Sequence, residues 1–144
     1  MPGSDGLPDI KIHSIMKARW MNIPVNDQSA ALGFYTSKLG FIVKDDMPMG
    51  PMRWLTVVSP HDPDGLEIVL QATAFPGAAA LQQAQFAAGM PAAAFHSADV
   101  RSEYTHLKHL GVTFRGEPVS MGPITAVLFE DTCGNLINLV QPAT

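Results

Sequence analysis

The order of hydrophobic and polar residues along this chain occurs twice. An alternating segment ends at Val25, a segment with apolar residues every three to four positions follows, and short apolar segments then continue to Gln71. The same order returns between Ala92 and Val140. Alternation is typical of a half-buried strand, and a three-to-four spacing is typical of an amphipathic helix. Each half is therefore predicted to be β-α-β-β-β, and the repeat indicates two copies of one structural unit.

Capping residues set the boundaries of the predicted helices. Asp27 and Asp99 are good N-caps, and Gly40 and Gly111 suit the left-handed position that ends a helix. Helices are expected at 28–39, 78–86 and 99–110. Strands are expected at 17–25, 41–44, 54–58, 66–71, 92–97, 112–115, 123–129 and 135–140, with the Met47–Met52 segment as a break.

Composition places the chain among globular proteins. Its 144 residues are 47% hydrophobic and 15% charged, with a net charge of −4. Lysine and arginine are scattered, so we expect no nucleic-acid partner and no anionic membrane partner. No run of 18 apolar residues exists, the first residues lack the pattern of a secretory signal, and Cys133 is the single cysteine. We therefore expect a cytoplasmic protein without an intrachain disulfide.

Between residues 19 and 141 the chain resembles a known family. The matching segments are IPVND, then FY and LGF, then DPDG before an apolar strand, and later LGV, FEDTCGN and INLV. They are similar to the glyoxalase/bleomycin-resistance/extradiol-dioxygenase group, the vicinal oxygen chelate superfamily. The resemblance implies an α+β fold in which two tandem βαβββ modules form curved mixed sheets around a cavity. The predicted organisation is a flexible lead-in at 1–12 and one domain at 13–144, with module one at 17–73, a linker helix at 74–91 and module two at 92–141.

The resemblance also implies where a divalent metal would be held. The four positions that usually carry its ligands correspond to Trp20, Val69, Ala92 and Asn138. Metals need nitrogen, sulfur or oxygen donors, and an indole N–H cannot ligate. Only Asn138 offers an oxygen, so we predict no cofactor, with a divalent metal as the alternative.

Strand alternation extends these four positions to two faces of a cavity. The residues expected to point inward are Trp20, Asn22, Pro24, Glu67, Val69, Gln71, Ala92, Ala94, His96, Leu136, Asn138 and Val140. A largely apolar surface with a few polar groups is typical of a small-molecule site.

Two of the inward residues are predicted as catalytic candidates. Glu67 would be a general base or a displaced metal ligand, or else a carboxylate at the solvent rim. His96 would exchange protons with a ligand, because its ordinary pKa lies near neutrality, or would be a plain hydrogen-bonded histidine. Trp20 would stack on a planar ligand or fill the space of a metal. Asn138 would touch the ligand or satisfy a polar position of the core.

The segment from Met47 to Met52 holds three methionines, two prolines and a glycine. Thioethers adapt to apolar ligands of different shapes, so Met49 is predicted to contact the ligand unless this loop packs on the body. Arg53 would bind an anionic group of the ligand or lie in solvent. Cys133 is expected to be a packing residue.

Three functions remain open from the sequence. The chain would be a metal-free small-molecule-binding protein, an enzyme such as a lyase, isomerase or dioxygenase with a shifted or metal-free site, or an interaction module with a closed cavity. The resemblance implies that two chains complete each other's cavities, and twofold dimers are the commonest oligomers, so a homodimer is expected.

Overall fold

The structure is a computed structural model that describes residues 15–143, and its first half forms one four-stranded sheet. The strands are β1 (Trp20–Val25), β2 (Ile42–Met49), β3 (Met52–Val58) and β4 (Glu67–Ala72), in the order β1-β4-β3-β2. β1 runs parallel to β4, and the remaining pairs are antiparallel. The helix α2 (Gln28–Ser37) begins after Asp27, whose side chain accepts a hydrogen bond from the Ala30 N–H.

The second half repeats this plan. Its strands are β5 (Pro91–His96), β6 (Phe114–Met121), β7 (Ile124–Glu130) and β8 (Leu136–Pro142), in the order β5-β8-β7-β6. The helix α4 (Val100–His109) is capped by Asp99. A third helix, α3 (Ala78–Ala87), joins the two modules. The predicted α+β fold of two βαβββ modules is therefore confirmed.

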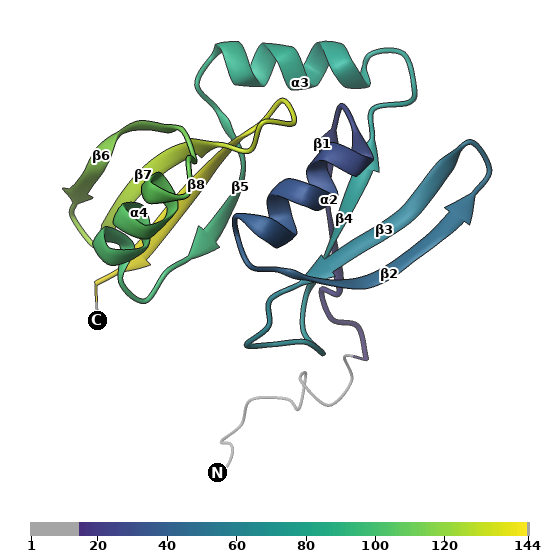
Figure 1. The fold of residues 1–144 in the computed structure, drawn as a ribbon. Helices are drawn as coiled ribbons and strands as arrows, with labels where there is room; N and C mark the ends of the chain where they lie inside the picture. Colours follow the sequence, from purple (N-terminus) through teal and green to yellow (C-terminus); the bar gives the residue numbers. More distant parts are fainter. Residues whose placement is uncertain (1–14, 144) are drawn as a thin grey trace, which may run out of the picture.

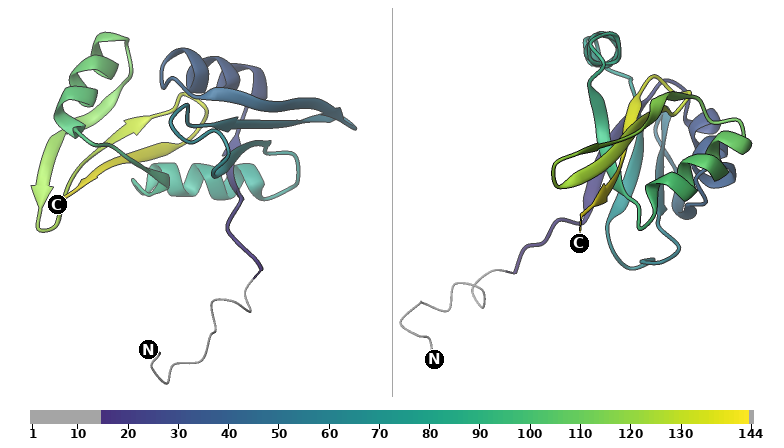
Figure 2. Two further views of the ribbon diagram at one scale, coloured as in Figure 1. Left: turned by 90° about the horizontal axis from the view of Figure 1, so that it is seen from below. Right: turned by 90° about the vertical axis from the view of Figure 1, so that its left-hand side faces the viewer.

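The two modules lie side by side and share one hydrophobic core. α2 and α4 lie on the same side of the two sheets, and α3 spans the top of the molecule (Figures 1 and 2). The core includes Ile23, Tyr35 and Leu70 of the first module with Phe129 and Ile137 of the second. Because the core is continuous, the helix-covered face of each module is buried partly by the other module.

A buried polar network fixes the turn between β7 and β8 against the first module. Asp131 accepts hydrogen bonds from the Tyr35 hydroxyl at 2.7 Å, from the backbone N–H groups of Cys133 and Asn135, and from the Asn135 side chain. Burial, together with the neighbouring Asp131 carboxylate, raises the pKa of Tyr35 far above its ordinary value. The tyrosine therefore stays a hydrogen-bond donor.

The linker helix takes part in the same junction through one side chain. Gln82 is buried and its amide donates to the carbonyl oxygens of Pro24 and Cys133 at 3.0 Å each. Asn26 donates its backbone N–H to the Cys133 carbonyl. One end of β1, α3 and the β7–β8 turn are thus joined by hydrogen bonds.

Several predicted boundaries need correction. The Met47–Met52 segment does not break the strand, because the β2–β3 ladder continues to the pair Met49 and Met52 around a turn at Gly50, which has a φ of 61°. The strand predicted at 112–115 is β6, which begins at Phe114 and extends to Met121, and the strand predicted from residue 17 begins at Trp20. The predicted lead-in at 1–12 lies outside the described residues. No helix within residues 15–143 has the length and apolarity to cross a membrane.

Candidate functional site

The residues predicted to share an inward face in the first module do share one. β1 and β4 are paired so that Trp20 lies beside Glu67, Asn22 beside Val69 and Pro24 beside Gln71. The intervening Ile23 and Val25 are completely buried in the helix-covered core. Alternation therefore turns Trp20 and its partners to the face without a helix, which we call the open face.

The second module has an equivalent open face. Asn138 pairs with Ala94 on β5 and with Leu128 on β7, while the neighbouring Leu139 and Ile137 are buried in the core. Ala92 lies at a shift of register between Pro91 and Ala93, so it has no paired residue on β8. The open faces of both modules point to the side of the molecule opposite α2 and α4 (Figure 2).

Within a single chain the open faces remain largely accessible. Trp20 is 57% exposed, and Asn22 and Gln71 are exposed as well. Val69 is buried and Asn138 is half-buried. The open face therefore presents an aromatic ring and amide groups over a packed aliphatic floor.

Glu67 is not the solvent-exposed rim carboxylate that one interpretation of the sequence proposed. It is 2% exposed, and its Oε2 accepts hydrogen bonds from Nε and Nη2 of Arg19 at 3.0 and 2.9 Å. The backbone N–H of Glu67 also donates to the Arg19 carbonyl at 2.8 Å. The Arg19 guanidinium lies 5.5 Å from the centre of the Trp20 ring, within the range of a cation–π contact.

This environment sets the protonation of Glu67. Burial is the largest single influence and opposes ionisation, but hydrogen bonding from Arg19, the neighbouring Thr56 hydroxyl and the positive charges of Arg19 and Lys44 together lower the pKa of Glu67 below its ordinary value. A carboxylate with a lowered pKa that is already bound by a guanidinium is a weak general base. The geometry therefore favours a structural role for Glu67 over the predicted catalytic one.

His96, the other predicted catalytic residue, lines a different surface. It ends β5, is exposed, and contributes to a cleft between the two modules. The residues on either side of Glu67, which are Leu66 and Ile68, line that cleft too. Glu67 itself pairs with Arg19, and no hydrogen bond or ion pair within residues 15–143 joins it to His96.

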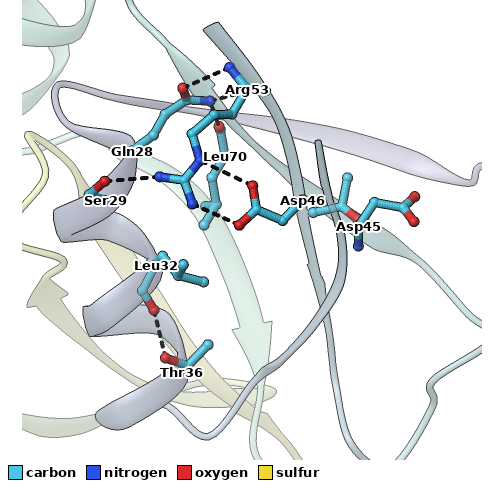
Figure 3. A network of polar contacts seen from close by, with 9 residues as sticks. Gln28, Ser29, Leu32, Thr36, Asp45, Asp46, Arg53 and Leu70 are labelled. Carbon is cyan, nitrogen blue, oxygen red and sulfur yellow. Dashed lines mark hydrogen bonds and ion pairs between the residues drawn. The ribbon is translucent and has the colours of Figure 1, made fainter. Parts of the chain in front are cut away.

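Arg53 points away from the open face. Its guanidinium binds the Asp46 carboxylate at 2.8 Å and the Ser29 hydroxyl at 2.9 Å, while the Gln28 amide bonds to the backbone of Arg53 and to the Leu70 carbonyl (Figure 3). This network ties the β2–β3 hairpin to the first turn of α2. Arg53 is thereby engaged within the chain, whereas Met49, on the other face of the hairpin, is half exposed.

Three open-face residues did not figure among the sequence-predicted ligand contacts. Thr56 of β3 pairs with Val69, and Trp54, two residues before it, lies on the same face of that strand. In the second module, Leu128 of β7 pairs with Asn138. Counting alternate residues from the buried Leu55 and Val57 would have found Trp54 and Thr56. The open face of the first module thus carries two tryptophans.

The side chains at the four positions implied for a metal do not fit one. Trp20 on β1 offers only an indole N–H, Val69 on β4 and Ala92 on β5 offer no donor atom, and Asn138 on β8 supplies a single amide oxygen. Among residues 15–143 no group of three or more histidine, cysteine, aspartate or glutamate residues is arranged to hold a metal ion. This donor set is too poor for Zn²⁺, Fe²⁺ or Mn²⁺.

Cys133 behaves as the packing residue that the sequence predicted. It is completely buried, and burial with the nearby Asp131 charge raises the pKa of its thiol to about 11. A thiol with that pKa is protonated at neutral pH and therefore a poor nucleophile.

Comparisons with known proteins agree with this architecture. The model of the Glyoxalase/Bleomycin resistance protein/Dioxygenase superfamily matches residues 11–139. The Bacillus subtilis (strain 168) protein YurT, itself uncharacterised, is 52% identical over 126 residues, which cover 88% of this chain and 99% of YurT.

Two solved structures extend the likeness. The crystal structure of UcmS2 is 34% identical with a TM-score of 0.77, covering 88% of this chain and 98% of UcmS2. The structure of TnmS3, an antibiotic binding protein from Streptomyces sp. CB03234, is 26% identical with a TM-score of 0.71, covering 90% and 98% respectively. On the family match, the YurT identity and the doubled βαβββ fold together, this chain belongs to the glyoxalase/bleomycin resistance protein/dioxygenase superfamily.

Proposed function

We propose that the open faces bind a small, largely apolar and planar ligand without a divalent metal. The observation that carries this proposal is the exposed Trp20 ring on the open face of the first module, with Trp54, Asn22 and Gln71 on the same sheet and Asn138 on the open face of the second module. Aromatic rings supply large contact areas, and a few amides fix the orientation of a ligand. The similarity to TnmS3, described as an antibiotic binding protein, supports binding as the activity.

The alternative of a lyase, isomerase or dioxygenase has less support. Glu67 is bound by Arg19 and has a lowered pKa, and His96 lines another surface. We also propose a cytoplasmic location, which agrees with one buried cysteine and no possible intrachain disulfide.

Replacement of Trp20 by alanine should weaken binding of an apolar aromatic probe about tenfold, because the exposed ring is the largest contact on the open face. The neutral fluorescent probe N-phenyl-1-naphthylamine is suitable, titrated against wild type and Trp20→Ala. The matched control is Phe75→Ala, which removes another exposed aromatic ring, located in the connection before α3. The control should bind as wild type does.

Two results would contradict the proposal. One is equal affinity of wild type and Trp20→Ala for the probe. The other is one tightly held transition metal per chain in protein purified without chelators, measured by elemental analysis.

We further propose that two copies associate and cover their open faces. The β2–β3 and β6–β7 hairpins end in the same Met-Gly-Pro sequence, at Met49–Pro51 and Met121–Pro123. Met49 and Met121 are each about half exposed, and Met47 and Val119 beside them are also exposed. Apolar side chains repeated on both outer hairpins favour a self-complementary contact between chains.

The double variant Met49→Glu/Met121→Glu should therefore shift the protein from two-chain to one-chain mass in size-exclusion chromatography with light scattering. Burial of four unpaired carboxylates per dimer would oppose association. Met90→Glu, at an exposed methionine between α3 and β5, should leave the mass unchanged. A wild-type protein with the mass of one chain at tens of micromolar would refute the dimer.

A further inference from the structure

A cleft of about 1030 Å³ lies between the two modules on the helix-covered side. Its floor includes the aromatic rings of Phe41 and Phe95, which meet edge to face at 5.4 Å, and the aliphatic side chains of Ile68 and Leu139. One wall is α4, and the opposite wall is the connection between β3 and β4. The open-face residue Trp20 does not line this cleft, so the two surfaces are distinct.

The internal repeat explains why the cleft exists. The β7–β8 turn of the second module is closed against the first module by the Tyr35–Asp131 hydrogen bond and by Gln82 of α3. The β3–β4 connection is the equivalent turn of the first module, with Asp62 in the place of Asp131. No linker helix is found at this second junction within residues 15–143, since α3 packs at the first.

The closing tyrosine is also replaced at the second junction. The helices α2 and α4 have equal lengths and follow the caps Asp27 and Asp99, so Leu107 takes the position of Tyr35. Leu107 and Asp62 both line the cleft, but a leucine side chain cannot hydrogen-bond to a carboxylate, whereas Tyr35 and Asp131 bond at 2.7 Å. The junction at the β7–β8 turn is therefore closely packed, and the equivalent junction at the β3–β4 connection is open.

The charges around the cleft define what it can accept. Three carboxylates, those of Asp62, Asp99 and Glu103, contribute to its lining, together with three imidazoles. None of the described lining residues is a lysine or an arginine. The cleft thus combines a negative rim with an aromatic floor, and aromatic faces attract cations.

The N-terminus of α4 does not reverse the preference of the cleft for cations. A free helix N-terminus attracts anions, but here the Ser102 N–H donates to the Asp99 side chain and the Val100 N–H donates to Gln141. The Asp99 carboxylate adds a negative charge at the same point. An anion entering the cleft would meet carboxylates and occupied donors.

We propose that this inter-module cleft is a second ligand site that binds a small organic cation with an aromatic body. The ring lies against Phe41 and Phe95, and the ammonium group lies toward Asp62 and Glu103. The site is separate from the open faces and does not depend on the ligand proposed for them.

The test compares three probes of one shape and different charge on the isotopically labelled full chain. They are 2-naphthylmethylamine as the cation, 2-naphthylmethanol as the neutral molecule and 2-naphthoate as the anion. Amide chemical shifts should change in a saturable way at 95–99 and 102–107 with the amine, with the alcohol weaker and the naphthoate at least about tenfold weaker than the amine.

Charge variants give the matched comparison. Asp62→Asn/Glu103→Gln should weaken binding of the amine about tenfold. Asp64→Asn/Glu117→Gln removes the same net charge from exposed residues outside the lining and should bind as wild type does. The proposal is overturned if the amine and naphthoate bind equally, if both double variants behave alike, or if the shifts map to the open face around Trp20 and Asn138.

Discussion

Replacement of Asp131 by alanine should lower the free energy of unfolding by about 3–5 kcal/mol. The carboxylate is completely buried and accepts from the Tyr35 hydroxyl, the Cys133 and Asn135 N–H groups and the Asn135 amide. Alanine removes both carboxylate oxygens that accept these hydrogen bonds, which leaves the Tyr35 hydroxyl and the Cys133 and Asn135 N–H groups buried without partners. An unsatisfied buried donor costs about 1–3 kcal/mol, and the network loses more than one.

Urea unfolding followed by circular dichroism measures this loss, and the repeat provides the control. Asp62 is the equivalent of Asp131 in the first module but is exposed. Asp62→Ala should change the free energy of unfolding by no more than about 0.5 kcal/mol. If Asp131→Ala costs as little as Asp62→Ala, the network does not hold the two modules together.

Replacement of Arg19 by alanine should lower the free energy of unfolding by about 2–4 kcal/mol at pH 7. Glu67 is buried, and Arg19 is the side chain that donates hydrogen bonds to its Oε2. Its other carboxylate oxygen already has no hydrogen-bond partner among the described residues. Without Arg19 the folded chain would hold an uncompensated buried carboxylate.

The effect should depend on pH in a defined direction. The pKa of Glu67 is lowered in the folded chain, so the ion pair stabilises the fold above the ordinary value of 4.5. That contribution is lost as the pH falls through the lower folded pKa. The difference between wild type and Arg19→Ala should therefore shrink between pH 7 and pH 3, as measured by urea unfolding.

Arg115 offers a matched control for the same substitution. It pairs with Glu130 at 3.0 Å, but both side chains are far more exposed than Glu67. An exposed ion pair contributes about 0–1 kcal/mol, so Arg115→Ala should have a small effect. A loss for Arg19→Ala that matches the loss for Arg115→Ala, or that does not vary with pH, would contradict the role given to the buried pair.

Local patterns predicted the elements well where the determining interactions are local. Asp27 and Asp99 cap α2 and α4 as expected, because a side-chain cap needs only residues three positions away. The Met47–Met52 segment was misjudged, because cross-strand pairing with β3 carries β2 through Pro48 to Met49. Pairing partners of that kind are not visible in a short window of sequence.

The candidate site also has features that follow from local sequence and features that depend on long-range contacts. Alternation correctly placed Trp20, Asn22, Val69 and Gln71 on one face, since side chains of a strand alternate strictly. It could not show that Arg19 binds Glu67 across 48 residues, or that Arg53 is occupied by Asp46 and Ser29. Those facts depend on which segments meet in space.

The sequence by itself determined the doubled βαβββ fold and the poor donor set at the four positions implied for a metal, because repeats, caps and strand alternation act over short distances. Only the tertiary structure decided the burial of Glu67 against Arg19, the closure of one junction by Tyr35, Gln82 and Asp131, and the open cleft at the other. Two nearly equivalent modules are joined by a single linker helix, which packs at one junction, so long-range packing makes the two halves of a repeated sequence unequal.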